Sequence, residues 1–434
     1  MRNRYNRYRK SLFVRSFCGL LFAAFSFAFL YFMQGDLLAE AQYVYSEGIT
    51  TYSPLAGAFI ITFILLIIQW VIRIILPFNE NYYALSYLPS CMLLAILVSI
   101  DESILVNFSW GNLVWILPII LCAYLLMVYL LYKVTSLENV NNITKTDRSV
   151  WINSLMLLVM FVIVGGIANT NDIFTYELKT ERLICEGRYD KAASVGEKSL
   201  RSSRRLTELR MFALANNGML CEQMFNYPHY FGTKGLLDIS DTLPGIYRVS
   251  SSDVCKAIGV CPDENNDTQE YLEMAFNLID SVHLNKSVTE QMQNVADEMN
   301  ELTDVSDSVN VQLIKDYYYA FLLLDKDINK FCTLFDTSKI DVLPKVYSEA
   351  VVLAYEFNMN EAISNNNSEQ INNLQLKELY SRVDSVVIKR RAEYNELYNS
   401  IPNKLERMNK LRRNYGDTYW WYYDYSDSVA NPIY

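Results

Sequence analysis

The sequence predicts an all-α membrane protein, with about five transmembrane helices in residues 1–169 and an α-helical domain in residues 170–434. Three observations support this fold class. The chain has 434 residues, of which 51% are hydrophobic and 20% charged, whereas soluble domains are usually about 25% charged. Long apolar runs are confined to the first part of the chain. In the second part, apolar residues recur at three- and four-residue spacing, and strand patterns are nearly absent.

Five apolar runs before residue 169 predict the membrane helices. A helix needs about 20 residues to cross about 30 Å of hydrocarbon, and each run is close to that length. Lipid offers the backbone no hydrogen-bond partners, so such runs must be helical. The first run is too long for the apolar part of a cleaved signal peptide, so we expect an uncleaved anchor. The expected spans are residues 11–33, 55–76, 83–100, 111–132 and 151–168.

The distribution of basic residues predicts the orientation. With five spans and an inside N-terminus, every Lys and Arg before residue 169 falls on one side of the membrane. The loops on the other side contain the acidic residues Asp36, Glu40, Glu47, Asp101 and Glu102 and no basic ones. Basic loops stay in the cytoplasm. We therefore expect a cytoplasmic N-terminus and place residues 170–434 outside, in the periplasm of a Gram-negative cell or in a lumen or the exterior of a eukaryotic one.

One stretch of the second part carries a repeat pattern. Residues 186–200 read EGRYDKAASVGEKSL, in which Gly187, Tyr189 and Ala192 have the spacing Gly-x-Tyr-x-x-Ala. Gly187 would permit a tight turn between two helices, and Tyr189 would fill the groove beside Ala192. Residues 174–217 thus resemble a tetratricopeptide repeat. The resemblance implies stacked helix pairs, and since about three are needed for stability, we expect the others to be divergent.

The domain layout carries a second, wider resemblance. A multi-pass anchor followed by an exported helical-repeat domain is similar to a family of uncharacterised envelope membrane proteins of Bacteroidota, which implies an inner-membrane location and no particular activity. Residues 228–266 are rich in Pro, Gly and Ser and predict a loop-rich insertion with a short helix around residues 251–258. Residues 170–434 are one domain or two domains separated at this insertion.

Cysteine and histidine usage argues against metal chemistry. Cys255 and Cys261 flank a short loop, and in an oxidising compartment a disulfide between them is one reading. No second Cys pair or His pair accompanies them, so we expect no metal site and no cofactor. The two histidines, His229 and His283, lack the motif of a catalytic dyad or triad, and we expect structural or surface roles for both.

The first outer loop contains the best candidates for catalysis. Asp36 and Glu40 are four residues apart, so a helical extension of the first span would place both carboxylates on one face. This resembles integral-membrane glycosyltransferases, which carry acidic residues in the first outer loop for metal or acceptor activation. Those enzymes have eight or more spans, and the competing reading is solvated carboxylates that follow the charge asymmetry.

Two surfaces are candidates for partner binding. Arg204 and Arg205 lie in an Arg-rich stretch and can bind a phosphate or carboxylate with two hydrogen bonds each; pairing with nearby Glu residues is the alternative. The tail at residues 417–434 is densely aromatic, and Trp420, Trp421 and Tyr423 are candidate contacts. Packing on the chain's own core is the leading alternative, and contact with the bilayer interface is a third.

These features predict an integral membrane scaffold that presents a helical-repeat domain to envelope proteins. The alternatives are a membrane enzyme of glycan or lipid-linked substrates that uses Asp36 and Glu40, and an accessory subunit whose spans dock in a larger complex. The expected partners are the lipid bilayer and unidentified envelope proteins. The net charge of −10 and pI near 5.0 argue against nucleic acid.

Overall fold

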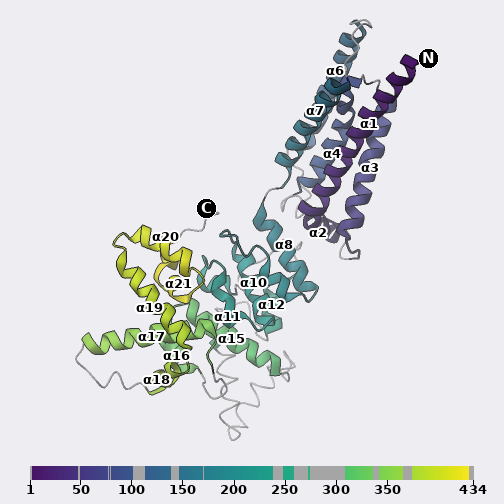
Figure 1. Cartoon of the computed structure of the whole chain (residues 1–434). Coiled ribbons are helices and arrows are strands. Elements are labelled where there is room, and N and C mark those ends of the chain that lie inside the picture. The colour runs from purple at the N-terminus through teal and green to yellow at the C-terminus, as the bar shows by residue number, and fades with distance from the viewer. Residues whose placement is uncertain are drawn as a thin grey trace. The chain divides into compact units, whose positions relative to one another are not determined.

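The fold is known from a computed structural model of the chain (Figure 1). It divides into two compact units, residues 1–178 and residues 179–434. Every element in the described residues is helical, which confirms the all-α prediction. The structure describes residues 2–46, 49–76, 78, 80–100, 113–137, 146–169, 171–237, 248–258, 272–273, 308–335, 342–364 and 374–429.

Unit 1 is a bundle of apolar helices. Its core joins buried side chains of α1, α3, α4 and α7, among them Phe22, Leu65, Leu94 and Leu157. Large apolar side chains on the other faces stay exposed, as a lipid-facing helix requires. The elements are α1 (Arg2–Ala28), the π-helix η1 (Phe29–Met33), α2 (Gly35–Tyr45), α3 (Pro54–Ile75), the 3-10 helix η2 (Glu80–Tyr87), α4 (Leu88–Val98), α6 (Leu113–Leu137) and α7 (Thr146–Ile167).

Buried hydrogen bonds connect the helices of unit 1 around η2. The Gln69 Nε2 atom of α3 donates to Tyr83 Oη (3.1 Å) and Ser86 Oγ (2.9 Å). The Asn153 side chain of α7 accepts from the Ala84 backbone N–H at 2.7 Å. Buried polar groups need such partners, and here neighbouring helices supply them.

Three helices of the described residues, rather than the expected five, are long and apolar enough to cross a membrane. They are Leu12–Met33, Pro54–Ile75 and Arg148–Ile167. The expected span at residues 83–100 is divided between η2 and α4, because Pro89 lies in the first turn of a new helix. The expected span at residues 111–132 belongs to α6, whose apolar segment among the described residues is the shorter Pro118–Leu130.

Unit 2 consists of short and medium helices, several of which pack on one of their number. Helix α8 (Asp172–Cys185) begins in unit 1 and ends in unit 2. The others are α9 (Tyr189–Ser194), α10 (Arg204–Asn216), α11 (Leu220–Gln223), η3 (Met224–Asn226), η4 (Gly232–Gly235), α12 (Ser251–Ile258), α15 (Ser308–Leu324), α16 (Ile328–Leu334), α17 (Lys345–Ser364), α18 (Leu374–Ser381), α19 (Ser385–Ser400), α20 (Lys404–Tyr415), α21 (Tyr419–Tyr425) and η6 (Ser426–Ser428). The helices that pack on α17 are α11, α16, α18, α19 and α21.

The same turn closes three of these helices. A residue with positive φ stands two positions after the last residue of each of α8, α10 and α15: Gly187 (70°), Gly218 (68°) and Lys326 (64°), respectively. At each turn this residue's N–H bonds the carbonyl three positions earlier, and the next N–H bonds the carbonyl five positions earlier. This is the Schellman ending of a helix. A short second helix follows each time, namely α9, α11 and α16.

The second residue after each of the three turns is buried or half-buried. Two residues after the turn stand Tyr189, Leu220 and Ile328; Leu220 and Ile328 are buried, and Tyr189 is half-buried with its ring 6.3 Å from that of Phe212. Ala192, five residues after Gly187, has no exposed surface. The first two turns are 31 residues apart. The described part of unit 2 thus contains three helix–turn–helix segments closed by the same turn.

We expect Gly218→Ala to destabilise unit 2 by about 1 kcal/mol, because an L-residue with a side chain pays that cost in the left-handed region. A Cβ at Gly218 would meet no atom within 4 Å, so backbone strain is the sole cost. The measurement is denaturant unfolding of the solubilised chain. The adjacent Asn217→Ala is the control: Asn217 is exposed with ordinary φ (−89°), and its change should stay within about 0.5 kcal/mol. Equal effects of the two variants would contradict the turn's role.

Candidate functional site

The C-terminal helix α21 is the most densely aromatic element of unit 2. Thr418 caps its N-terminus by accepting the Trp421 N–H at 3.3 Å. Tyr419 and Trp420 have no exposed surface. Their rings contact Phe225 (5.3 Å between centroids) and Tyr394 (5.9 Å), respectively. Residues 418–422 therefore pack in the core of unit 2.

Glu349 of α17 fixes this helix in place. Its Oε2 accepts the Tyr419 backbone N–H at 2.7 Å, and its backbone carbonyl accepts the Trp420 Nε1–H at 2.7 Å. The Glu349 side chain is 1% exposed. Burial raises the pKa of Glu349 to about 8, against the lowering effect of the Lys345 charge. At neutral pH this carboxyl therefore holds its proton in most folded molecules.

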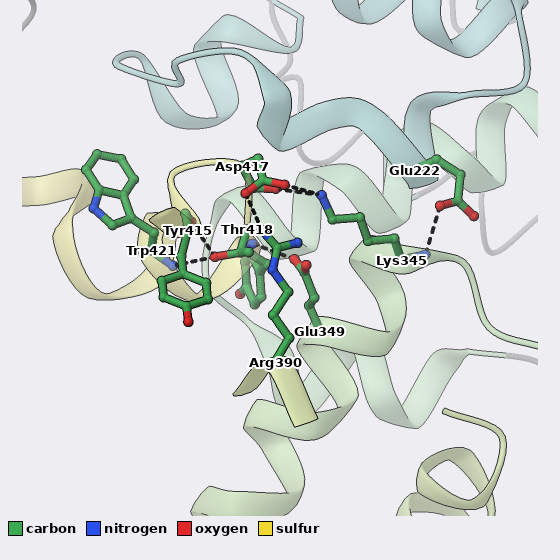
Figure 2. A network of polar contacts seen from close by, with 9 residues as sticks. Glu222, Lys345, Glu349, Arg390, Tyr415, Asp417, Thr418 and Trp421 are labelled. Atoms are coloured by element: carbon green, nitrogen blue, oxygen red, sulfur yellow. Dashed lines mark hydrogen bonds and ion pairs between the residues drawn. The ribbon is translucent and has the colours of Figure 1, made fainter. Parts of the chain in front are cut away.

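A polar network surrounds the start of α21 (Figure 2). Asp417 lies between Lys345 of α17 and Arg390 of α19, with Oδ2–Nζ and Oδ1–guanidinium distances of 2.8 and 2.6 Å. Burial alone would raise the pKa of Asp417, but the hydrogen bonds and charges of the two cations lower it. The Lys345 backbone N–H, at the start of α17, donates to Glu222 Oε2 at 3.2 Å. The network thus links α11, α17, α19 and the α20–α21 connection.

A pocket of about 230 Å³ adjoins this network. Three parts of the chain line it: the segment after α9, the segment around η3, and the end of α20 with α21 and the residues that follow. The lining residues are Glu197, Ser199, Leu200, Phe225, Asn226, Tyr227, Pro228, His229, Tyr230, Arg412, Arg413, Gly416, Asp417, Trp421, Tyr422, Ser426 and Val429.

His229 forms part of the pocket wall and packs among aromatic rings. Its ring centroid lies 5.3 Å from that of Phe225 and 6.0 Å from that of Tyr422. Nε2 is 2.8 Å from the Met224 carbonyl, which can only accept, so Nε2 carries the proton. Burial lowers the pKa of His229 to about 4. The imidazole is therefore neutral at physiological pH.

The three aromatic residues predicted to contact a partner differ in how deeply they are buried. Trp420 is fully buried and Trp421 is 8% exposed, with its Nε1–H bonded to the Met408 carbonyl. In the folded chain these two rings serve packing, the leading alternative of the sequence analysis. Tyr423 is half-buried and contacts Phe357 at 5.6 Å.

The two predicted arginines also differ. Arg205 is 7% exposed and pairs with the buried Glu181 at 2.6 Å, and it also donates to the Val249 carbonyl at 2.7 Å. Arg204 is half-buried at the start of α10. Arg205 therefore forms an ion pair within the chain, which was the alternative to partner binding in the sequence analysis. Its partner, Glu181, lies in α8, 24 residues earlier in the sequence.

The remaining candidates have the following positions. Asp36 and Glu40 share the helix α2; Asp36 is half-buried and Glu40 is 1% exposed. Cys255 is buried in α12, whereas Cys261 and His283 lie outside the described residues. Within the described ranges, no group of three His, Cys, Asp or Glu side chains is arranged to hold a metal ion.

Sequence reasoning missed the network of Glu349, Lys345, Arg390 and Asp417. One pair in it is close in sequence: Lys345 and Glu349 are four residues apart on one helix face. The contact that matters, from α17 to α21, joins residues about 70 positions apart. An acid in the middle of an apolar helix pattern, as in YSEAVVLAY, was the available signal, since such an acid is buried only with partners.

Comparison with known proteins adds a family match for the same region. Residues 280–426 match the model of a family of unknown function, DUF6057. This match covers about a third of the chain and includes α15 to α21, and therefore most of the polar network. No curated protein and no solved structure matches the chain.

We expect Glu349→Gln to remove a loss of stability that the wild-type chain shows as pH rises. Because the folded-state pKa is raised from about 4.5 to about 8, the wild-type chain loses stability as pH rises from about 4.5 to 8. The loss amounts to about 4 kcal/mol. Glutamine keeps an acceptor for the Tyr419 N–H and does not titrate in this range.

The measurement is denaturant unfolding of both proteins at pH 5 and pH 8.5. Glu393→Gln, at an exposed position on α19, is the matched control and should leave the wild-type pH dependence intact. An unchanged pH dependence in Glu349→Gln would show that Glu349 does not titrate with a raised pKa.

Proposed function

We propose that this chain is an integral membrane scaffold or accessory protein whose residues 170–434 bind a protein partner in the cell envelope. The observation that carries the proposal is the succession of helix pairs closed by the same turn at Gly187, Gly218 and Lys326. Stacked helix pairs of this kind expose an extended surface that repeat proteins use for binding. The tetratricopeptide-like spacing of Gly187, Tyr189 and Ala192 agrees with this reading.

The charge pattern supports an inner-membrane location with residues 170–434 in the periplasm. The basic residues cluster at the N-terminus and around Lys145 and Arg148, whereas residues 34–54 contain none. Three spans and five spans are both odd numbers. A chain with three spans, like one with five, has its N-terminus and its residues after the last span on opposite sides of the membrane, so the revised count supports the same orientation.

Cysteine labelling tests this topology. A cysteine introduced as Asn217→Cys, at an exposed turn of unit 2, should react with a membrane-impermeant maleimide in cells whose outer membrane alone is permeabilised. Asn3→Cys, in the basic N-terminal segment, should react only after the inner membrane is opened. The native cysteines are replaced by Ser or Ala in both proteins. Labelling of both positions from the same side would contradict the proposed topology.

Site-specific photocrosslinking in intact cells tests partner binding. The photoreactive residue replaces exposed residues of successive helices in unit 2: Asn217, Lys256, Asp325 and Glu396. We expect some of these positions to give one protein adduct of constant mass at near-stoichiometric yield. Discrete adducts from none of them, or adducts with lipid-linked glycan alone, would contradict the scaffold proposal.

A membrane enzyme of glycan or lipid-linked substrates is the second candidate. It is favoured by one observation, that α2 carries Asp36 and the buried Glu40 four residues apart directly after the first span. The double variant Asp36→Ala, Glu40→Ala separates the two functions. A scaffold keeps its crosslinked partner and its cellular phenotype in this variant, whereas an enzyme loses the phenotype at normal expression.

A further inference from the structure

The pocket beside α21 has the features of a small-ligand site. Its walls include the rings of Phe225, Tyr227, Tyr230, Trp421 and Tyr422. Its volume of about 230 Å³ exceeds that of an apolar cavity of about 150 Å³ that accepts benzene. One ring-sized body with a small polar group therefore fits, and the aromatic lining favours an apolar or aromatic body.

Arg412 brings an oriented positive charge to this pocket. Its guanidinium carbon lies 5.1 Å from the centre of the Trp421 ring, and its NH2 donates to Tyr230 Oη at 3.0 Å. Tyr230 Oη in turn donates to the Leu200 carbonyl at 2.6 Å. The guanidinium is thus held from two sides by residues that also line the pocket, and its other N–H groups are not used by these contacts.

Arg413 adds a second positive charge, and the acids nearby do not neutralise the pair. Arg413 is exposed, and within the described part of the chain neither Arg412 nor Arg413 makes an ion pair. Of the two acids in the lining, Asp417 already pairs with both Lys345 and Arg390. The other is the exposed Glu197.

The lining itself contains two cations, Arg412 and Arg413, and two acids, Glu197 and Asp417, and the charge of Asp417 is met by Lys345 and Arg390 from outside the lining. His229 does not change this balance at neutral pH, because its imidazole is uncharged there. The unit as a whole is acidic, with 40 Asp and Glu against 28 Lys and Arg in residues 170–434. Two neighbouring guanidinium groups that form no ion pair in the described residues, beside aromatic rings in an acidic unit, therefore attract anions.

We propose that this pocket binds a compact organic anion, with an apolar or aromatic body against Tyr227, Tyr230 and Tyr422 and a carboxylate or phosphate group at Arg412 and Arg413. A guanidinium offers planar paired donors that match either group. The proposal goes beyond partner binding, since the pocket is complete within one chain. Its failure would leave the photocrosslinking test of the scaffold unaffected.

Calorimetric titration of the full chain in lipid nanodiscs tests the proposal. The probes are N-acetyl-L-tyrosine, its uncharged amide N-acetyl-L-tyrosinamide, and phenyl phosphate. We expect saturable binding of at least one of the two anions below about 10 mM, and at least about tenfold weaker binding of the amide than of the acid. The stronger of the two anions distinguishes a carboxylate ligand from a phosphate ligand. Binding of the amide as tight as that of the acid, or no binding of any probe, overturns the proposal.

Variants assign the binding to the pocket. Arg413→Ala changes an exposed side chain, so the fold is preserved, and anion affinity should fall by about tenfold or more. Arg412→Lys keeps the charge, loses the planar donors, and should also weaken binding. Lys410→Ala, an exposed cation on the same helix outside the pocket, is the matched control and should bind as the wild type does. Equal affinity of Arg413→Ala and Lys410→Ala overturns the proposal.

Discussion

The contact between Glu349 and the start of α21 organises the C-terminal half of unit 2. One residue of α17 accepts two consecutive donors, the Tyr419 amide through its carboxyl and the Trp420 indole through its carbonyl. Both aromatic side chains are fully buried, and rings of this size bury 150–250 Å² each. Without acceptors for these donors, the same burial would leave unsatisfied polar groups and would cost free energy instead. The ion pairs of Asp417 and the pocket wall both depend on α21 being held here.

Two buried titratable groups make unit 2 sensitive to pH in opposite directions. His229 is held neutral, with a pKa of about 4 against an ordinary 6.5, so stability falls as pH decreases from about 6.5 to 4. Glu349 is held protonated, so stability falls as pH increases from about 4.5 to 8. The contributions of these two groups together make unit 2 most stable in mildly acidic solution. Neither group needs a catalytic role to explain its pKa, because burial is the first cause for both.

The sequence predicted the all-α class correctly. Its predictions of membrane helices were correct where a long apolar run forms one continuous helix. The runs at residues 55–76 and 151–168 became α3 and the apolar part of α7, whereas a new helix begins around Pro89, the residue that interrupts the run at 83–100 in the sequence. The sequence analysis did not identify the helix–turn–helix segments at Gly218 and Lys326. They share the backbone turn of Gly187 but not the side chains around it. Lys326 adopts a conformation that normally indicates Gly, and Leu220 and Ile328 replace Tyr189. The α17–α21 contact was beyond pattern analysis, since it joins residues about 70 positions apart.

Hydrogen exchange at the Trp420 indole tests the central claim most directly, namely that unit 2 depends on the seating of α21. The measurement is the NMR exchange rate of the Trp420 Nε1–H in the intact chain, compared with core amides of α10 and α17. If α21 is part of the cooperative core, the indole proton exchanges only through global unfolding of unit 2, with the same free energy as the slowest core amides. Exchange that is faster by orders of magnitude, and insensitive to denaturant, would show that α21 opens locally and would contradict the account.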